Sequence, residues 1–571
     1  MKATNIFSLI FFLFCNFLSK SIYSQMNPIA DSLEIKSEEW LPVINERTPG
    51  YIITAVKDGV VIFEKMGGSS DLERNIPVTE NTVFNIGSLS KQFTAFLILL
   101  LEEEYKLSTE DEVSKYLPEY NIFKDKKIKI SHLLSHSSGL REQITMLQLC
   151  GKKDDDVYSS TDEKYLLMRQ KELNFKPGTM MQYSNTNYFV LALIIEKVTG
   201  EKFSDVCRER IFIPLEMTTA VVADNHRNLI PDKAEAYNTF KENESMKYSP
   251  SDDDYGHSSI YCTVNDLKKW ADNFKQKKIG SFELYKKFFS NGVFDNGKEI
   301  KTYGYGWFHD NYKGIPVLWH DGARLGFRSG LLYFPEKNLY IITLCNARDF
   351  PYADIRDKIA DAILKDQFPE KAEEEIKIIP LKRVTDRTES ELKQYTGLYW
   401  DRTGDQLWNI QLKNGALIAD DYIMVPEGEN LFRLKDGDNL TNSSMKFYKK
   451  PGGDDWQLIF TRGREVTFKS DNTFLYEHAD SEMNKDIKEI TGLYYSEELD
   501  VKFEIRSADD HLELYIRGYD KPIIISNVFK DYFADSDFAG LLFHRNSQNN
   551  VTGFIFINQK ANNILFSKII F

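Results

Sequence analysis

Ser88 and Lys91 stand at the start of the stretch "NIGSLSKQFTAFLILLLEEEYKL" (residues 85–107), whose second half predicts a helix. Its apolar residues recur at three- and four-residue spacing, which is the period of a helix face. Because helical residues three positions apart share a face, the lysine amine can reach the serine oxygen. Apolar neighbours and the positive end of the helix dipole both favour the neutral amine. A neutral amine accepts a proton from serine, so the pair predicts an activated nucleophile.

The Ser-x-x-Lys spacing is not specific by itself, because it recurs at Ser390–Lys393 and at Ser443–Lys446. Ser390 lies in a charged linker. Ser443 leads into a predicted strand, where positions three apart face opposite sides. Only Ser88 begins a long apolar helix, which makes it the candidate nucleophile of the three.

Two further segments carry side chains suited to a catalytic site. The stretch "MMQYSNTNYFVLALIIEKVTG" places Tyr183 and Asn185 on a loop that leads into a helix, and "LWHDGARLGFRSGLLYF" places His320 near the end of a strand. Taken singly, Tyr183 also fits a core tyrosine and Asn185 a helix cap. His132 and His136, in "SHLLSHSSGL", are interpreted as packing or loop-tethering residues without a catalytic role.

In this order and at these spacings, the three segments resemble the motifs Ser-x-x-Lys, Tyr-x-Asn and Lys/His-x-Gly of the serine β-lactamase and penicillin-binding-protein superfamily. The closest resemblance is to the class C β-lactamase branch, which also includes DD-peptidases, D-aminopeptidases and esterases. The phrases "IKISHLLSHSSGL", "IFIPLEM" and "SSIYCTVNDLKKWADNF" are similar to that branch too. The resemblance therefore covers roughly residues 28–368.

The resemblance implies catalytic roles for three side chains. Ser88 would be the nucleophile. Lys91 and Tyr183 would share the general-base and general-acid work, with the tyrosine kept acidic by cationic neighbours.

The resemblance also implies a set of substrate-binding groups. Asn185 would orient the substrate amide and the lysine, and His320 and Gly322 would form the third motif. The backbone N–H groups of Ser88 and Ala323 would form the oxyanion hole.

The third motif departs from the pattern of the family's β-lactamases, which usually have lysine followed by threonine. This chain has His320 followed by Asp321. A histidine is mostly neutral above its reference pKa of about 6.5, so a fixed positive charge is lost. Asp321 would add a negative charge if it faces the site, while Arg324 and Arg328 are nearby cations whose direction the sequence leaves open. We therefore expect weak activity on substrates that carry a carboxylate next to the scissile bond.

The elements that position these residues predict an α+β catalytic domain. Predicted strands at residues 50–65 and from about 315 to 345 flank a mainly helical stretch between about 105 and 275. This order indicates an antiparallel sheet flanked by helices, with an inserted helical subdomain. After a charged linker, short alternating strands predict two small all-β barrel-like domains. A faint repeat, "YTGLYW" at 395–400 and "ITGLYY" at 490–495, suggests that these two domains are duplicates.

The predicted domain boundaries follow from these changes in predicted secondary structure and charge along the chain. They are residues 1–24 for a signal peptide, 25–368 for the serine hydrolase domain, 369–390 for the linker, 391–480 for one β-rich accessory domain and 481–571 for the second.

The first 24 residues have the charged start, apolar run and small polar end of a secretory signal. The apolar run is shorter than the ~20 residues of a membrane span, so we expect an exported, periplasmic or secreted protein without a stable span.

The net charge of −14 argues against nucleic acid as a partner. Cys150, Cys207, Cys262 and Cys345 are expected to be mostly free, buried thiols. No cofactor or metal site is predicted.

Together these features predict an exported serine hydrolase that acts through an acyl-enzyme on an amide or ester bond. The favoured substrates are small molecules or peptides that contain D-amino acids, cleaved by a peptidase or esterase. A β-lactamase or DD-carboxypeptidase is the alternative within this class. A non-catalytic scaffold that binds a glycan or protein through its C-terminal barrels is the alternative from another class.

Overall fold

A computed structural model describes most of the 571-residue chain. The described residues are 30, 33–153, 156–242, 244–248, 252–369, 387–401, 406–437, 439–449, 455–461, 473–479, 483–484, 487–508, 511–535 and 538–570. The predicted signal peptide and most of the predicted linker lie outside them. The chain divides into two compact units. The first holds the described residues up to Leu100, Glu201–Phe289 and those from Gly306 to 369; the second holds Leu101–Gly200, Ser290–Tyr305 and those from 387 onward.

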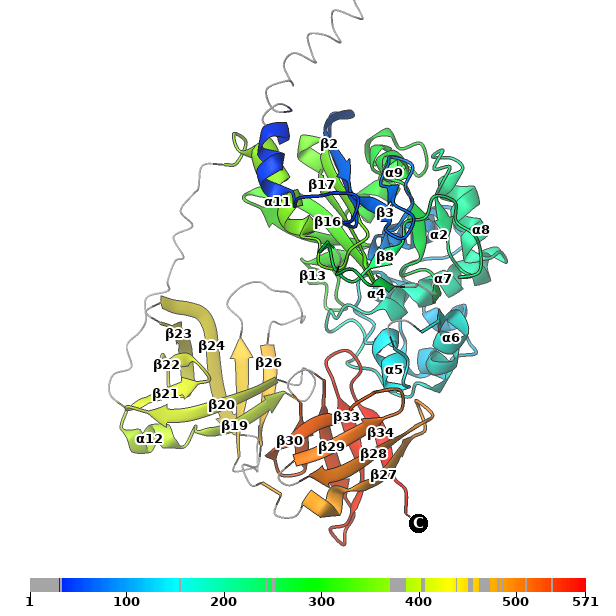
Figure 1. Cartoon of the computed structure of the whole chain (residues 1–571). Coiled ribbons are helices and arrows are strands. Elements are labelled where there is room, and N and C mark those ends of the chain that lie inside the picture. Colours follow the sequence, from blue (N-terminus) through cyan, green and yellow to red (C-terminus); the bar gives the residue numbers. More distant parts are fainter. Residues whose placement is uncertain are drawn as a thin grey trace, which may run out of the picture. The chain divides into compact units, whose positions relative to one another are not determined.

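The first unit is built on an antiparallel sheet of order β15-β16-β17-β18-β1-β2 (Figure 1). Its strands are β15 (Trp307–Tyr312), β16 (Ile315–Arg324), β17 (Phe327–Phe334), β18 (Leu339–Cys345), β1 (Tyr51–Lys57) and β2 (Val60–Gly67). β1 and β2 are joined by a turn at Asp58 and Gly59, both of which have positive φ. The chain therefore supplies this sheet from its N-terminal end and, after a long insertion, from residues beyond 306.

The two faces of this sheet are covered by different helices. α11 (Tyr352–Leu364) packs on one face, where its Ile355, Ile359 and Ile363 join the apolar cluster of β1, β17 and β18. α2 (Ser90–Glu103) and α9 (Val264–Gln276) belong to the other face. Trp270 of α9 stacks on Phe93 of α2 with ring centroids 4.3 Å apart. α2 is therefore held by aromatic packing on the face opposite α11.

The remaining elements of the first unit are short. They are β3 (Ser69–Asp71), β4 (Ile76–Pro77), β5 (Phe84–Asn85), the 3₁₀ turn η1 (Gly87–Leu89), α8 (Phe203–Cys207), the π turn η3 (Arg208–Phe212), β7 (Val221–Val222), β8 (Ala236–Tyr237), β9 (Lys247–Tyr248), β10 (Asp252–Asp253), β11 (Ile260–Cys262), α10 (Phe282–Phe288) and η4 (Pro335–Lys337).

The second unit combines the predicted helical subdomain with the C-terminal strands. Its helical part contains η2 (Val113–Lys115), α3 (Asn121–Lys126), α4 (Ile130–Leu134), α5 (Gln143–Leu149), β6 (Tyr158–Ser159), α6 (Ser160–Arg169), α7 (Asn185–Thr199), β12 (Gly292–Val293), β13 (Glu299–Ile300) and β14 (Tyr303–Gly304). α7 is buried along most of its length, which agrees with the apolar run that predicted it.

Two closed antiparallel barrels follow, which confirms the predicted pair of β-rich domains. The first, preceded by α12 (Glu389–Lys393), consists of β19 (Gly397–Asp401), β20 (Gln406–Lys413), β21 (Ala416–Ala419), β22 (Tyr422–Pro426), β23 (Leu431–Asp436), β24 (Asn439–Lys449), β25 (Trp456–Thr461) and β26 (Thr473–Ala479). The second, preceded by η5 (Ile487–Ile490), consists of β27 (Gly492–Ser496), β28 (Val501–Ala508), β29 (His511–Ile516), β30 (Ile523–Phe529), β31 (Tyr532–Ala534), β32 (Gly540–Arg545), β33 (Val551–Ile557) and β34 (Ile564–Lys568).

The repeated "TGLY" segments occupy equivalent places in the two barrels. Gly397 opens β19 with φ of 141°, and Gly492 opens β27 with φ of 145°. Tyr399 donates its hydroxyl to the carbonyl oxygen four residues earlier, and Tyr494 does the same. The shared backbone conformation and hydrogen bond support the duplication that the sequence suggested.

The second barrel and the helices α5 and α6 form one apolar cluster. Met146 and Leu147 of α5 and Leu166 of α6 pack with the buried residues of β27–β34. Arg141, just before α5, is fully buried and donates to the Glu498 carboxylate at 2.6 Å. The helical subdomain is therefore bound to the second barrel by apolar packing and by a buried ion pair.

Two further expectations concern the whole chain. Cys150, Cys207, Cys262 and Cys345 are free thiols as expected, although Cys150 is only half-buried. None of the described helices is long and apolar enough to cross a membrane.

Candidate functional site

Ser88 and Lys91 meet as the sequence predicted. Ser88 lies in η1, which runs directly into α2 at Ser90, so the two side chains share one face of the first turns. The Lys91 ammonium nitrogen lies 3.1 Å from the Ser88 hydroxyl oxygen. Ser88 is partly exposed whereas Lys91 is fully buried. A substrate can therefore reach the serine oxygen while the lysine is withheld from water.

A backbone carbonyl that the sequence did not reveal gives Lys91 a second partner. The lysine ammonium donates to the His257 carbonyl oxygen at 2.9 Å. The same loop is fastened to α2 by the Thr94 hydroxyl, which donates to the Gly256 carbonyl at 2.5 Å, and by the Ser90 hydroxyl, which accepts from the Ile260 N–H at 3.2 Å. The loop before β11 therefore fixes the lysine head group relative to Ser88.

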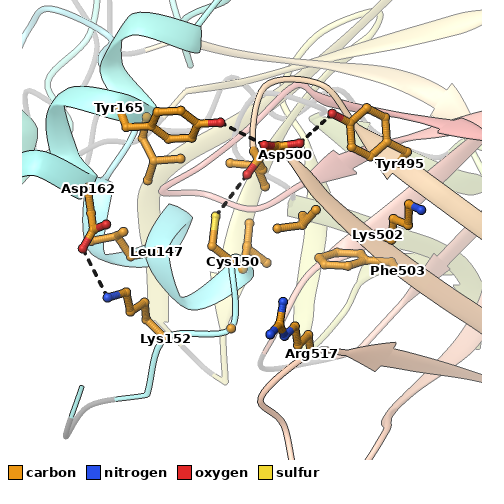
Figure 2. Close-up of a pocket in the computed structure, with 15 residues that line it drawn as sticks. Leu147, Cys150, Lys152, Asp162, Tyr165, Tyr495, Asp500, Lys502, Phe503 and Arg517 are labelled. Atoms are coloured by element: carbon orange, nitrogen blue, oxygen red, sulfur yellow. Dashed lines mark hydrogen bonds and ion pairs between the residues drawn. The ribbon is translucent and has the colours of Figure 1, made fainter. Parts of the chain in front are cut away.

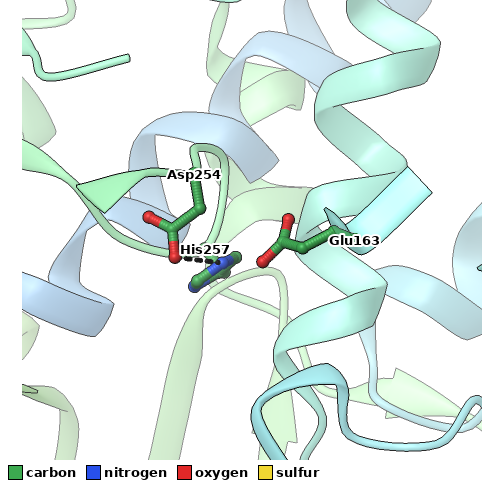
Figure 3. Close-up of side chains that lie close together, drawn as sticks. All are labelled: Glu163, Asp254 and His257. Atoms are coloured by element: carbon green, nitrogen blue, oxygen red, sulfur yellow. Dashed lines mark ion pairs between the residues drawn. The ribbon is translucent and has the colours of Figure 1, made fainter. Parts of the chain in front are cut away.

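Asp254 and His257 shape this loop from within (Figure 3). His257 Nε2 lies 3.4 Å from the Asp254 carboxylate, and both residues are buried. The other carboxylate oxygen accepts from the Ser259 hydroxyl at 2.6 Å. Ser259 has φ of 72°, a conformation that needs such support. The nearest sequence signal was the phrase beginning at Ser258, which pointed to the family but not to the His257 carbonyl.

Two glycines let η1 and β16 approach each other. A Cβ on Gly322 would lie 2.0 Å from the Ile86 carbonyl oxygen, and a Cβ on Gly87 would lie 2.7 Å from the Ala323 nitrogen. Gly87 also has φ of 51°, which favours glycine. The backbone of Ala323 therefore runs beside the turn that carries Ser88. The assignment of the Ser88 and Ala323 N–H groups to an oxyanion hole stays a prediction that this proximity supports.

His320 is buried and carries no fixed positive charge. Its Nδ1 is 2.7 Å from the Asp321 carbonyl oxygen, so Nδ1 holds the ring proton and donates it. Burial and the charge of Lys91 lower the pKa of His320 to about 3. The expectation that the third motif lacks the family's permanent cation is therefore supported.

Asp321 faces away from His320, which removes the negative charge that the sequence allowed for at the site. Successive strand residues alternate in direction, and Asp321 binds Arg356 of α11 at 2.5 Å and Tyr352 at 3.3 Å. Arg328 pairs in register with Ala323 and so also lies on the α11 face. Only Arg324 shares the face of His320 and Gly322. Of the two cations that the sequence left open, the strand register thus selects Arg324.

Tyr183 lies in the second unit, on the loop before α7. Its ring packs on that of His136 with centroids 4.2 Å apart, and the Tyr303 ring is 6.0 Å away. His136 Nδ1 accepts from the Ser184 N–H at 3.2 Å, which ties the loop down. This confirms His136 as a loop-tethering residue. Tyr183 itself is partly exposed, unlike a core tyrosine.

Asn185 is the first residue of α7, and Ser184 is the N-cap, so the interpretation of Asn185 as the cap is wrong. The Asn185 amide donates to one oxygen of Glu142 at 2.9 Å, and its backbone N–H donates to the other at 2.5 Å. Glu142 is a residue that the sequence analysis missed. It fixes the amide orientation of Asn185 from the start of α5.

The β33–β34 loop of the second barrel holds the segment that precedes Tyr183. The Glu142 N–H donates to the Lys560 carbonyl at 2.8 Å, and Asn174 donates to the same carbonyl at 3.1 Å. The Gln182 side chain donates to the Gln559 carbonyl. No local pattern signalled these contacts, because they join residues 377 or more positions apart.

The predicted site residues thus fall into two groups. The first unit brings together Ser88, Lys91, His320, Gly322 and Ala323. Tyr183 and Asn185 belong to the second unit, where each has its own supporting partners.

The other two Ser-x-x-Lys segments lack the features of the first. Ser390 and Lys393 are exposed on the short helix α12 rather than in an irregular linker. Ser443 and Lys446 lie in strand β24 as predicted. Among the three lysines, only Lys91 is fully buried next to its serine.

Comparison with known proteins supports the family resemblance that the sequence motifs indicated. The sequence profile of the family described as beta-lactamase matches residues 34–365. The D-aminopeptidase of Gluconobacter oxydans is 24% identical over 481 residues, which cover 83% of this chain and 84% of that protein. The D-aminopeptidase of Brucella anthropi is 28% identical over 306 residues, which cover 53% of this chain and 57% of that protein. The chain thus spans little more than half the length of that second relative.

A solved structure agrees at the level of the fold. The octameric penicillin-binding protein homologue from Pyrococcus abyssi has a TM-score of 0.50 at 23% sequence identity. The match covers 78% of this chain and 99% of that chain. This likeness and the described elements confirm the α+β fold with its inserted helices. The family match covers more than half of the chain, which therefore belongs to the β-lactamase family of serine hydrolases.

Proposed function

We propose that this protein hydrolyses amide bonds through an acyl-enzyme on Ser88, and that its substrates are small amides or peptides with an N-terminal D-amino acid. The observation that carries the proposal is the 3.1 Å contact between Ser88 and the buried Lys91. A lysine withheld from water beside an accessible serine fits a nucleophile and its base. The D-aminopeptidases among its relatives support the substrate class.

In the proposed reaction, Lys91 acts in its neutral amine form, and the Ser88 oxygen attacks the substrate carbonyl carbon while its proton passes to this amine. Collapse of the tetrahedral intermediate breaks the C–N bond, and a proton returns to the leaving amine. Water then attacks the ester and releases the acid and free Ser88. We assign Tyr183 a share of the proton transfer, and Asn185 a contact to the substrate amide, from their place in the second motif.

Backbone N–H groups are assigned to the developing negative charge on the carbonyl oxygen. The Ser88 and Ala323 amides lie on the two segments that Gly87 and Gly322 allow to approach closely. Such donors stabilise the transition state more than the ground state, because they meet a charge that exists only there.

The third motif favours substrates without a carboxylate beside the scissile bond. His320 supplies no positive charge near neutral pH, since its pKa is lowered to about 3. Loss of a charge-assisted contact costs about 1.5–3 kcal/mol. For substrates that carry this carboxylate, we therefore expect kcat/KM to be lower by roughly 10- to 150-fold.

The test is a substrate panel measured with the full chain. We expect D-alanine p-nitroanilide to exceed its L-enantiomer, nitrocefin and a peptide ending in D-Ala-D-Ala in kcat/KM. A short-chain aryl ester serves as the uncharged ester control. Labelling with a fluorophosphonate and peptide mapping should place the adduct on Ser88. An adduct on Ser390 or Ser443, or an L-selective enzyme, would overturn the proposal.

A β-lactamase or DD-carboxypeptidase is the second candidate, and Arg324 is the observation that favours it. This arginine shares the face of β16 with His320 and Gly322, which supports assigning it the missing lysine charge in this alternative. If nitrocefin or the D-Ala-D-Ala peptide leads the panel, Arg324→Gln should remove that preference. Arg328→Gln is the matched control, because Arg328 lies on the α11 face.

Export is a separate proposal that rests on residues 1–24. Its test is N-terminal sequencing of the protein recovered from the cell exterior or periplasm, which should begin near residue 25. Recovery of the uncleaved chain from the cytoplasm alone would contradict it.

A further inference from the structure

A cavity of about 600 Å³ opens in the second unit between α5, α6 and the second barrel (Figure 2). Ligand pockets in proteins commonly have about 300–1,000 Å³, so a small organic molecule fits this one. The cavity is lined by Leu147, Leu149, Cys150, Gly151, Lys152, Asp162, Tyr165, Leu166, Tyr495, Leu499, Asp500, Val501, Lys502, Phe503 and Arg517.

One side of the cavity is apolar, where the buried side chains of the helices meet those of the barrel. Leu147 and Leu166 come from the helices, and Leu499 and Phe503 come from the barrel. All four are buried residues of one apolar cluster. A hydrocarbon or aromatic group placed here would be shielded from water, which stabilises binding in proportion to the apolar area removed.

Two positively charged side chains line the barrel side of this cavity, Lys502 of β28 and Arg517 just after β29. Phe503 of β28 pairs with Ile516 of β29, so the two cations come from the same end of these strands. Figure 2 shows the Phe503 ring between them. Neither side chain has an ion-pair partner among the residues that the structure describes. An anionic group at this end of the cavity would supply the missing opposite charge.

The negative groups of the cavity already have partners. Asp500 accepts from the Tyr495 hydroxyl at 2.7 Å and from the Tyr165 hydroxyl at 2.9 Å. Asp162 pairs with Lys152 at 3.2 Å. The two unpaired cations thus set the preference for charge, and the anionic head of a ligand belongs at Lys502 and Arg517.

We propose that the cavity between α5, α6 and the second barrel binds an amphiphilic anion, with its apolar body against Leu147, Leu166 and Phe503 and its head group at the end lined by Lys502 and Arg517. The guanidinium fork suits a carboxylate or a phosphate oxygen pair, and the lysine adds a point charge. This site lies within the second unit and is independent of the reaction proposed for Ser88.

The test is calorimetric titration of the full chain with octanoate and with octyl phosphate, which share the apolar body and differ in the head. Octanol supplies the same body without charge, and acetate supplies the charge without the body. We expect at least one of the two octyl anions to bind at least about tenfold more tightly than octanol, with no detectable binding of acetate. The tighter anion identifies the preferred head group.

Variants locate the site. Arg517→Gln combined with Lys502→Gln should weaken binding of the octyl anion by about tenfold or more. Both residues are exposed, so their replacement leaves the barrel core intact. Lys530→Gln removes an exposed charge from the same barrel outside the cavity and should change nothing. A photoreactive diazirine analogue of octanoate should label peptides containing residues 147–152 or 499–503. Equal binding of octanol, no effect of the double variant, absence of binding, or labelling elsewhere would each overturn the proposal.

Discussion

The Lys91 ammonium nitrogen lies 3.1 Å from the Ser88 hydroxyl oxygen and is held there by a backbone carbonyl from a loop more than 160 residues away, at His257. A cation in the first turn of a helix opposes the helix dipole, and these two contacts explain why a lysine stands there. The lysine is positioned by the tertiary structure as the partner of the serine, and its burial keeps bulk water from competing for that role.

Replacing Lys91 should abolish most of the activity. We expect Lys91→Ala to lower kcat/KM by ~10²-fold or more, because the base that takes the Ser88 proton is lost. The measurement is the steady-state rate with the best substrate of the panel. Lys393→Ala, in the exposed Ser-x-x-Lys segment of α12, is the control and should keep the wild-type rate. A Lys91→Ala enzyme with near-normal turnover would remove Lys91 from the mechanism.

Gly322 should not tolerate a side chain. The added Cβ of Gly322→Ala would lie 2.0 Å from the Ile86 carbonyl and 2.3 Å from the Ser329 hydroxyl, so β16 and η1 must separate. We expect a loss of about 1–3 kcal/mol in the free energy of unfolding, typical of overpacking, together with reduced turnover. Urea unfolding and kcat/KM measure the two effects. Gly428→Ala is the control, because its Cβ would meet Leu431 at an ordinary 3.4 Å.

His320 should make the protein less stable in mild acid. Its pKa is about 3 in the folded chain and about 6.5 when unfolded, because burial and Lys91 disfavour the charged ring. Between these values the unfolded chain binds more protons, so the free energy of unfolding rises with pH. This contribution is complete above about pH 6.5 and is lost as pH falls toward 3.

The measurement is urea unfolding at several pH values between 4 and 6.5. His320→Gln should flatten the dependence by up to about 1.4 kcal/mol per pH unit, since one proton is no longer exchanged. His511→Gln, in the second barrel, serves as the control variant. An unchanged slope in His320→Gln would show that His320 does not titrate as described.

The ion pair between Arg141 and Glu498 should be essential for the second unit. Arg141 also donates to the Asn562 carbonyl at 2.7 Å and to Gln170 at 2.6 Å. Arg141→Met leaves the buried Glu498 charge uncompensated, which costs about 3–5 kcal/mol. Urea unfolding followed by circular dichroism measures this loss.

An exposed pair of the same chemistry provides the comparison. Arg506 binds Glu504 on the surface of β28, and Arg506→Met should cost no more than about 1 kcal/mol. The double variant Arg141→Met with Glu498→Gln should recover part of the loss. A stable Arg141→Met protein would mean that the ion pair with Glu498 is not essential for the second unit.

Local sequence patterns determined much of the architecture. The three- and four-residue spacing after Ser88 predicted the helix α2, and the "TGLY" repeat indicated the paired barrels. These features depend on interactions within a few residues, which a sequence window contains. The Ser88–Lys91 contact was predictable for the same reason, because one helical turn connects the two side chains.

Tertiary structure alone decided which other groups the predicted site residues contact. Strand register turned Asp321 toward Arg356 and left Arg324 on the face of β16 that carries His320, a choice that depends on which face of β16 meets α2. Lys91 contacts the His257 carbonyl, and Asn185 contacts the Glu142 carboxylate, each through a contact between separate segments of the chain. No local period encodes such contacts, because they arise only when separate elements pack and bury their polar groups against one another.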